Sequence, residues 1–238
     1  MTSEHSAKST VDQTPCFQSL SEDTRLRLGE ALRAVTLIRN DVLFHREASI
    51  DGCYLVEQGA LKVSIEDHTG GETWLAILGA GDLVGELGLI DHRRRSATVS
   101  AMTECRLWRL SIGDYETLSS LDATLNQCVV RLVCERLRLT NQQVCDQRMG
   151  LEARLAQTML KLADAFGEPL PDGRVLIRYR IGQSRLAEVA GASRENVNRQ
   201  IRSWRQVGLC DRINNYYCLS TLPKWKMLRG DNIPTNTG

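Results

Sequence analysis

The sequence predicts an α+β protein in which an all-β module, one long helix and a small helical domain follow one another. Three observations support this prediction. Short apolar segments separated by glycines fill residues 41–110, residues 122–149 contain no glycine and repeat apolar positions every three or four residues, and a glycine joins two short amphipathic segments between residues 180 and 205. These patterns are typical of strands with tight turns, of one long helix and of a helical pair, respectively.

The composition is that of an ordinary folded chain. Of 238 residues, 42% are hydrophobic and 25% are charged, which excludes a collagen, a coiled-coil rod and a wholly disordered chain. No apolar run approaches the ~20 residues of a membrane span, and the polar start lacks the basic and apolar sections of a signal peptide. We therefore expect a cytoplasmic protein with no membrane partner.

Eight cysteines are scattered along the chain, and no CxxC or HxxxH pair occurs. A cytosolic chain of this length does not need disulfides to fold, so we expect free thiols. Structural zinc sites use short ligand spacings that are absent here. We expect neither a metal nor a prosthetic group.

The charge is divided unevenly between two parts of the chain. Residues 1–145 carry 15 Lys and Arg against 20 Asp and Glu, a formal charge of −5, whereas residues 146–238 carry 15 against 9, a formal charge of +6. A basic C-terminal part indicates that this part, and not the acidic first part, meets a polyanion.

The first 121 residues contain the all-β module. Residues 1–15 are polar and are expected to be flexible, and residues 16–121 are expected to form the module together with short helices that lead into it up to Leu37, with Ser21 as an N-cap. Strands are expected over 53–56, 61–65, 74–78 and 97–100, and glycine turns at a spacing of about 10 residues indicate a small barrel or sandwich.

Residues 122–149 are expected to form a long helix with two apolar stripes. We interpret one stripe as packing on the β-module and the other as pairing with the same helix of a second subunit; the alternative is a monomer that buries both. Gly150 then breaks the helix and is a candidate hinge. The seam comprises Asn126, Val130, Val133, Leu137, Thr140 and Val144, and the neighbouring stripe comprises Leu125, Val129, Leu132 and Leu139.

Residues 150–230 are expected to form a winged helix-turn-helix, followed by a flexible tail at 231–238. Gly191 permits the turn, Ser193 is a good N-cap for the second helix, and Asn214-Asn215 between two strand-like segments predicts the wing hairpin. Near its start the second helix carries Arg194 and Glu195, side chains that read guanine and cytosine edges in a major groove. The alternative is a helix face that only meets water.

A glycine-rich segment, residues 79–89, precedes the run Arg93-Arg-Arg-Ser-Ala-Thr98. Glycines let backbone amides approach an anion, an arginine neutralises a phosphate, a serine hydroxyl donates to it, and Glu86 could accept a ribose hydroxyl. From these residues alone, a β-turn followed by a solvated arginine run remains the alternative.

Gly85-Glu-Leu-Gly-Leu89 followed by Arg95-Ser-Ala97 resembles the phosphate-binding cassette of cyclic-nucleotide-binding domains. The order of modules is similar to that of the catabolite activator and fumarate-nitrate regulator (CRP/FNR) superfamily over roughly residues 17–222. The resemblance implies a jelly-roll-like, cyclic-nucleotide-binding β-roll, a long dimerisation helix and a C-terminal winged helix-turn-helix. The nucleotide-binding residues that it implies are Val63, Leu75, Gly85, Glu86, Leu87, Arg95, Ser96, Ala97, Arg136, Thr140 and Asn141.

The resemblance also assigns roles within these sets. Glu86 holds the ribose, Arg95 and Ser96 bind the cyclic phosphate, and Thr140 and Asn141 reach the purine. Asn141 stands where the family usually has serine, so the choice between cyclic AMP and cyclic GMP stays open. In the second helix-turn-helix helix the family implies base readout by Arg194, Glu195 and Arg199, phosphate contacts by Gln183, Ser184 and Arg202, and a half-site similar to TGTGA.

Together these features predict a homodimeric transcription regulator, not an enzyme. Cyclic AMP or cyclic GMP is its allosteric ligand, and its partners are a palindromic DNA operator and RNA polymerase. The alternative is a family member that needs no effector or that senses a redox or other signal. No Walker loop, GxSxG or HExxH string supports an enzyme.

Overall fold

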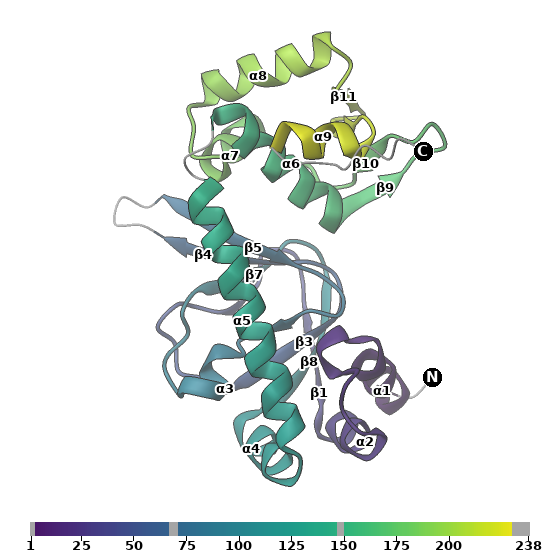
Figure 1. The fold of residues 1–238 in the computed structure, drawn as a ribbon, viewed down its shortest axis with the longest axis vertical. Helices are drawn as coiled ribbons and strands as arrows, with labels where there is room; N and C mark the ends of the chain where they lie inside the picture. The colour runs from purple at the N-terminus through teal and green to yellow at the C-terminus, as the bar shows by residue number, and fades with distance from the viewer. Residues whose placement is uncertain (1–2, 67–70, 147–149, 230–238) are drawn as a thin grey trace, which may run out of the picture. The chain divides into compact units, whose positions relative to one another are not determined.

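The computed structural model describes residues 3–66, 71–146 and 150–229 (Figure 1). The chain divides into two compact units, an N-terminal unit with residues 1–65 and 74–140 and a C-terminal unit with residues 66–73 and 141–238. Within the described residues, no helix combines the length and the apolar character of a membrane span. The same residues hold no group of three His, Cys, Asp or Glu side chains that could share a metal ion.

The N-terminal unit is a β-roll of two four-stranded sheets. Side chains from both sheets, among them Val56, Leu61 and Leu107, form one buried apolar cluster, which holds the sheets together. The first sheet has the order β1 (Arg33–Leu37), β8 (Cys105–Ser111), β3 (Gly52–Gln58) and β6 (Leu83–Val84), and the second has β2 (Val42–Phe44), β7 (Thr98–Ala101), β4 (Leu61–Glu66) and β5 (Glu72–Leu78).

All four strands predicted for the β-module are present, and the predicted fold class is confirmed. The strands β1, β2, β6 and β8 were not predicted, and the leading helices were predicted to extend to Leu37, which lies in β1. Leu37 pairs with Cys105 across the sheet, so a partner about 70 positions away in the chain decides its conformation.

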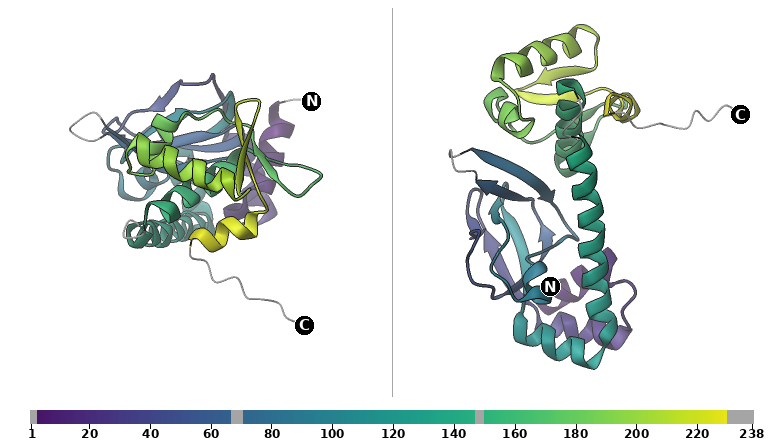
Figure 2. Two further views of the ribbon diagram at one scale, coloured as in Figure 1. Left: turned by 90° about the horizontal axis from the view of Figure 1, so that it is seen from above. Right: turned by 60° about the vertical axis from the view of Figure 1, so that its left-hand side comes forward.

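Helices cover one end and one side of the β-roll (Figures 1 and 2). The structure has a helix, α1, where a flexible segment was predicted for residues 1–15, because Ala7 and Val11 are one turn apart and both are buried in the core. Ser21 caps α2 as predicted, with its Oγ accepting from the Thr24 amide at 3.1 Å. The helices are α1 (Ser3–Gln13), the 3₁₀ helix η1 (Pro15–Phe17), α2 (Glu22–Ala31), α3 (Leu87–Asp91), α4 (Ile112–Leu121) and α5 (Ala123–Asp146).

The two stripes of α5 have different environments. Leu125 and Val129 are buried in the cluster that also contains residues of β3 and β8, whereas Val130 and Leu137 of the seam are 41% and 59% exposed. Val133 is half-buried. Leu139 was predicted for the packed stripe, and this was wrong: it is 63% exposed, because it lies beyond the part of α5 that covers the core. Residues 147–149 and the side chain of Val144 lie outside the described residues.

The C-terminal unit is a winged helix-turn-helix, as predicted. Its core is centred on Trp204 and Trp225, whose rings meet edge to face with centroids 4.6 Å apart. The second of these comes from α9, a helix that the sequence analysis did not predict. The elements are α6 (Leu151–Phe166), β9 (Gly167–Pro169), β10 (Val175–Ile177), α7 (Gln183–Val189), α8 (Arg194–Gln206), β11 (Cys210–Ile213), β12 (Tyr216–Leu219) and α9 (Leu222–Arg229).

Local signals fix the turns of this unit. Ser193 caps α8 by accepting from the Asn196 amide at 3.2 Å, and Gly191 in the preceding turn has a φ of +59°. Asn214 and Asn215 have φ values of 50° and 68°, the geometry of a two-residue hairpin turn. Gly150 is the N-cap of α6; its role as a hinge stays a prediction, and the predicted tail at 231–238 lies outside the described residues.

Candidate functional site

The glycine-rich segment leads from β6 through Gly85 and Glu86 into α3. Gly85 has a φ of +81°, and a Cβ at this position would lie 2.3 Å from Nη1 of Arg95. Only glycine therefore allows the arginine to pass this close to the backbone. The segment between the two residues folds back so that the predicted phosphate-binding arginine lies directly against the cassette.

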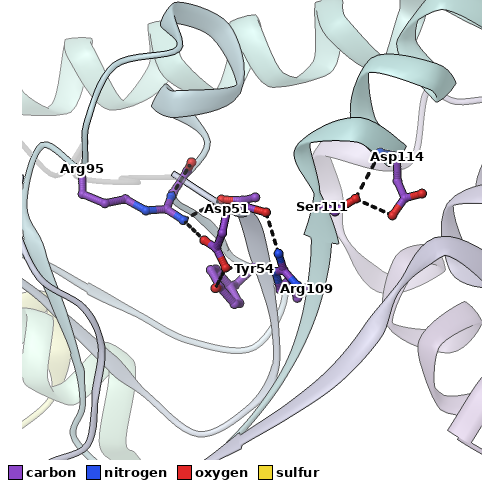
Figure 3. A network of polar contacts seen from close by, with 8 residues as sticks. Asp51, Tyr54, Arg95, Arg109, Ser111 and Asp114 are labelled. Carbon is purple, nitrogen blue, oxygen red and sulfur yellow. Dashed lines mark hydrogen bonds and ion pairs between the residues drawn. The ribbon is translucent and has the colours of Figure 1, made fainter. Parts of the chain in front are cut away.

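Arg95 is buried, with 3% of its surface exposed. Its Nη1 donates to the carbonyl of Gly85 at 3.1 Å, and its Nη2 donates to the carbonyl of Gly52 at 2.8 Å and to Oδ1 of Asp51 at 2.5 Å (Figure 3). Its guanidinium carbon lies 4.0 Å from the ring centroid of Phe44. The Asp51 carboxylate therefore neutralises the positive charge of Arg95, which is the charge that a ligand phosphate would require.

Asp51 is the centre of this polar network. Its Oδ2 accepts from the Tyr54 hydroxyl at 2.6 Å and lies 3.0 Å from Nε of Arg109, and Nη2 of Arg109 donates to the Asp51 carbonyl at 2.8 Å (Figure 3). Burial, reinforced by the hydrogen bond to Asp51, raises the pKa of Tyr54 to about 12. The phenol therefore remains a donor to Asp51 throughout the physiological pH range.

Glu86 forms a second ion pair beside this network. The carboxylate is buried at 4% exposure, and its Oε2 lies 2.7 Å from Nη1 of Arg136 on α5. Arg136 also donates from Nη2 to the carbonyl of Leu83 on β6. Two bonds from one arginine thus connect α5 to both ends of the cassette turn.

The other predicted ligand-binding residues surround this centre less closely. Ser96 is exposed and Ala97 is buried, Leu87 is 38% exposed on α3, and Val63 on β4 and Leu75 on β5 are half-buried. Thr140 and Asn141 are exposed on α5, where the Thr140 hydroxyl donates to the Arg136 carbonyl at 2.9 Å. The structure therefore brings Gly85, Glu86, Arg95 and Arg136 together, and leaves Ser96, Thr140 and Asn141 open to solvent.

Asp51, Tyr54 and Arg109 are site residues that the sequence analysis missed. They come from the start of β3 and from β8, whose residues pair across the sheet: Tyr54 lies opposite Arg109. Nothing in the local pattern marks Asp51, which is a single acidic residue ahead of an apolar strand. The pairing of β3 with β8 places Arg109 beside Asp51 and Tyr54.

The helix-turn-helix presents a different kind of surface. Arg194, Glu195, Arg199 and Arg202 are all exposed on α8. Arg199 donates to the Asn196 side chain one turn earlier. At the start of α7, Gln183 is half-buried and Ser184 is exposed. The first turn of α8 therefore offers its side chains to solvent without rearrangement.

A cavity of about 640 Å³ lies at the root of the wing, beside α8. Gln183 and Arg202, two of the residues predicted to contact phosphate, line it together with Arg174 and Arg205. On the wing itself, the guanidinium of Arg180 lies 5.2 Å from the ring centroid of Tyr216. Several arginines of this unit thus lie on α8, the predicted recognition helix, and beside the wing.

The described cysteines are free, as predicted, and Cys145 lies outside the described side chains. Burial raises the pKa of the Cys16 thiol to about 12 and raises that of Cys53 as well. The thiolate is the reactive form, so the raised pKa values lower the fraction of these two thiols that is reactive at neutral pH.

Comparisons with known proteins agree with this arrangement. The cyclic nucleotide-binding domain family model matches residues 34–121, and the Crp-like helix-turn-helix domain model matches residues 153–229. The chain is 28% identical to the CRP-like cAMP-activated global transcriptional regulator of Mycobacterium tuberculosis over 193 residues, which cover 81% of this chain and 86% of that protein.

Two further comparisons extend this result. The cAMP-activated global transcriptional regulator Vfr of Pseudomonas aeruginosa is 31% identical over 164 residues, 66% of this chain and 74% of that protein. The solved structure of the c-di-GMP responsive global regulator CLP of Xanthomonas campestris has a TM-score of 0.69 and 22% identity, and the match covers 84% of this chain and 99% of that one. The chain therefore belongs to the CRP/FNR family of DNA-binding transcription regulators, with a domain for a cyclic nucleotide ligand ahead of its helix-turn-helix.

Proposed function

We propose that the protein is a homodimeric regulator that binds cyclic AMP or cyclic GMP in its β-roll and, in response, recognises an inverted repeat of TGTGA-type half-sites. One observation carries the proposal: the buried Glu86 and Arg95 of the cassette lie beside Gly85, and Arg136, 50 positions from Glu86 on α5, pairs with the Glu86 carboxylate. The same chain presents the side chains for base readout on an exposed helix.

The chemistry of the cluster fits a cyclic nucleotide. Arg95 supplies the charge for the phosphate, the exposed hydroxyl of Ser96 and the backbone around Gly85 supply further donors, and the Glu86 carboxylate accepts the ribose 2′-hydroxyl. The backbone at Leu87 and Ala97 helps to bind the phosphate, and the half-buried Val63 and Leu75 supply apolar surface for the ligand. Thr140 and Asn141, exposed on α5, reach the purine.

Arg136 is the proposed link between ligand and helix. It binds the Glu86 carboxylate that would hold the ribose, so a ligand that moves Glu86 also acts on α5. We infer that the seam of α5 pairs with a second copy through Val130, Val133, Leu137 and Val144, because large apolar side chains at 41% and 59% exposure gain free energy by pairing. Bending at Gly150 would then set the spacing of the two DNA-binding units.

DNA recognition is assigned to the first turns of α8. Arg194 and Arg199 can each bind two acceptors of a guanine, and Glu195 can accept from a cytosine amino group. Gln183, Ser184 and Arg202 contact phosphates and orient the helix, which supports reading of the half-site. RNA polymerase is the proposed protein partner at the promoter.

A second candidate is a regulator that needs no cyclic nucleotide or responds to another signal. The observation that favours it is that the anion-binding arginine already has a carboxylate partner, Asp51, at 2.5 Å. The relative from Xanthomonas campestris, described as responsive to c-di-GMP, is an example of the same fold with a different stated effector.

Calorimetric titration with cyclic AMP and with cyclic GMP tests the proposal, together with measurement of operator affinity and oligomeric state. We expect one of the nucleotides to bind, Arg95→Ala to lose that binding, and the nucleotide and a TGTGA inverted repeat to raise each other's affinity by the same factor. Operator binding by a dimer without any heat from either nucleotide would favour the second candidate. Binding that survives in Arg95→Ala would exclude the assigned pocket.

A further inference from the structure

The phosphate-binding arginine is already occupied in this structure, by a residue of the same chain. We propose that the Asp51 carboxylate is a displaceable substitute for the ligand phosphate: the ligand takes its place on Arg95, and Arg109 retains the released carboxylate. This inference rests on the proposed function, because it assumes that an anionic ligand binds at Arg95. It adds Asp51 and Arg109 as residues that set the affinity and charge selectivity of the site.

Arg95 needs an anion in every state of the protein. Its side chain is 2% exposed, and its Nε is buried without a hydrogen-bond partner. An uncompensated guanidinium at such a position is strongly unfavourable, because it has lost its water without gaining a counter-charge. Removing Asp51 from Arg95 is therefore favourable only if a second anion arrives at the same time.

Asp51, by contrast, can leave Arg95 at little cost. Its side chain is 44% exposed, so water can solvate the released oxygen. The two carboxylate oxygens also have separate partners: Oδ1 accepts from Arg95, whereas Oδ2 faces the Tyr54 hydroxyl and Nε of Arg109. When Oδ1 is released, the hydrogen bond from the Tyr54 hydroxyl to Oδ2 and the ion pair with Arg109 keep the carboxylate in position.

The charges of the network point to one class of ligand. Arg95, Arg109 and Asp51 sum to one positive charge, and the adjacent Glu86 and Arg136 cancel. Arg93 and Arg94 are exposed, so water screens them. One positive charge matches the single negative charge of a cyclic phosphodiester, while a 5′-phosphomonoester with two charges leaves an excess negative charge beside Asp51. We therefore assign to Asp51 a part in selecting cyclic phosphodiesters over monoesters.

The test compares the intact protein with Asp51→Asn, Arg109→Gln and the double variant, using cyclic AMP, cyclic GMP and 5′-AMP as probes in calorimetric titrations. Asp51→Asn removes the competing charge, and we expect it to tighten cyclic nucleotide binding about tenfold. It should tighten 5′-AMP binding by a larger factor, because the dianion was repelled more. Circular dichroism and urea unfolding of each variant establish that it is folded.

Arg109→Gln tests the second part of the exchange, since Arg109 pairs with Asp51. Without Arg109 to retain the released carboxylate, cyclic nucleotide binding should weaken severalfold. In the Asp51→Asn background, Arg109→Gln should not weaken binding. A merely structural role for Asp51 would weaken binding in both single variants and would not change the ratio between cyclic AMP and 5′-AMP.

The outcomes separate this inference from the proposed function. Equal nucleotide affinity in the intact protein and in Asp51→Asn overturns the exchange and leaves the proposed ligand standing. If a nucleotide binds to Asp51→Asn but not to the intact protein, the result supports the exchange and shows that Asp51 keeps the intact protein unresponsive. No binding of either cyclic nucleotide to either protein overturns both ideas.

Discussion

The arginines of the cassette and those of the recognition helix are expected to bind phosphate or base edges, yet the fold presents them in opposite ways. Arg95 is buried and paired with Asp51, whereas Arg194, Arg199 and Arg202 stand exposed on α8. A buried charge needs a partner for the protein to remain stable, so a ligand there must replace an internal contact. An exposed charge is solvated and free to bind, so its loss affects binding and leaves stability unchanged.

The largest effect that this comparison predicts is at the second buried pair, Glu86 with Arg136. Arg136→Ala leaves the Glu86 carboxylate, at 4% exposure, without its ion-pair partner. We expect it to lower the free energy of unfolding by about 2–3 kcal/mol, below the full cost for a buried pair because Arg136 is partly exposed. Urea denaturation measures this change.

Two further variants show whether the loss comes from the stranded carboxylate. Arg138→Ala removes an exposed arginine from the same helix and should change stability by less than about 0.5 kcal/mol. Adding Glu86→Gln to Arg136→Ala should restore part of the lost stability, because a neutral amide is cheaper to bury than an unpaired carboxylate. Equal destabilisation by Arg136→Ala and Arg138→Ala would show that the pair contributes nothing.

The opposite behaviour is predicted for Arg194→Ala. Unfolding by urea should be unchanged, since the side chain is exposed at the first position of α8. Discrimination at one base step of the half-site should fall by about 1–3 kcal/mol, while other positions keep theirs. Binding measured over a panel of single-base operator variants distinguishes this result from a uniform loss of affinity. A uniform loss would show that Arg194 contacts the DNA phosphate backbone and not a base.

The same contrast explains what could be predicted from the sequence. The DNA-binding unit depends on local signals: the Ser193 cap, the turn at Gly191 and the Asn214-Asn215 hairpin all act within a few residues. Their positions in the sequence therefore predicted α7, α8 and the wing hairpin correctly. In the cassette, the glycine turn and Arg95 were also found through a local string.

The partners of Arg95 could not be predicted in this way. Asp51 is 44 positions from Arg95 in the chain and Arg109 approaches from β8, a strand that the sequence analysis missed. The pairing of β3 with β8, between residues 48 to 59 positions apart, decides that Asp51 faces Arg109. The helices α1 and α9 were not predicted for the same reason, since burial of Val11 and Trp225 by distant elements stabilises them.

The smallest predicted effect is at Arg202, which tests whether exposed arginines on one helix differ among themselves. Arg202→Ala should weaken binding to all DNA sequences about equally, by less than about 1 kcal/mol, and lower the slope of log affinity against log salt by about 1. Arg205 lines the same cavity, but its Nη2 lies 3.5 Å from Oδ1 of Asp211. Arg205→Ala should therefore reduce the slope less than Arg202→Ala, because Asp211 already neutralises part of its charge. A larger slope change for Arg205→Ala would place the DNA backbone at the C-terminal end of α8, beyond Arg202, and would overturn the assignment of the phosphate contact to Arg202.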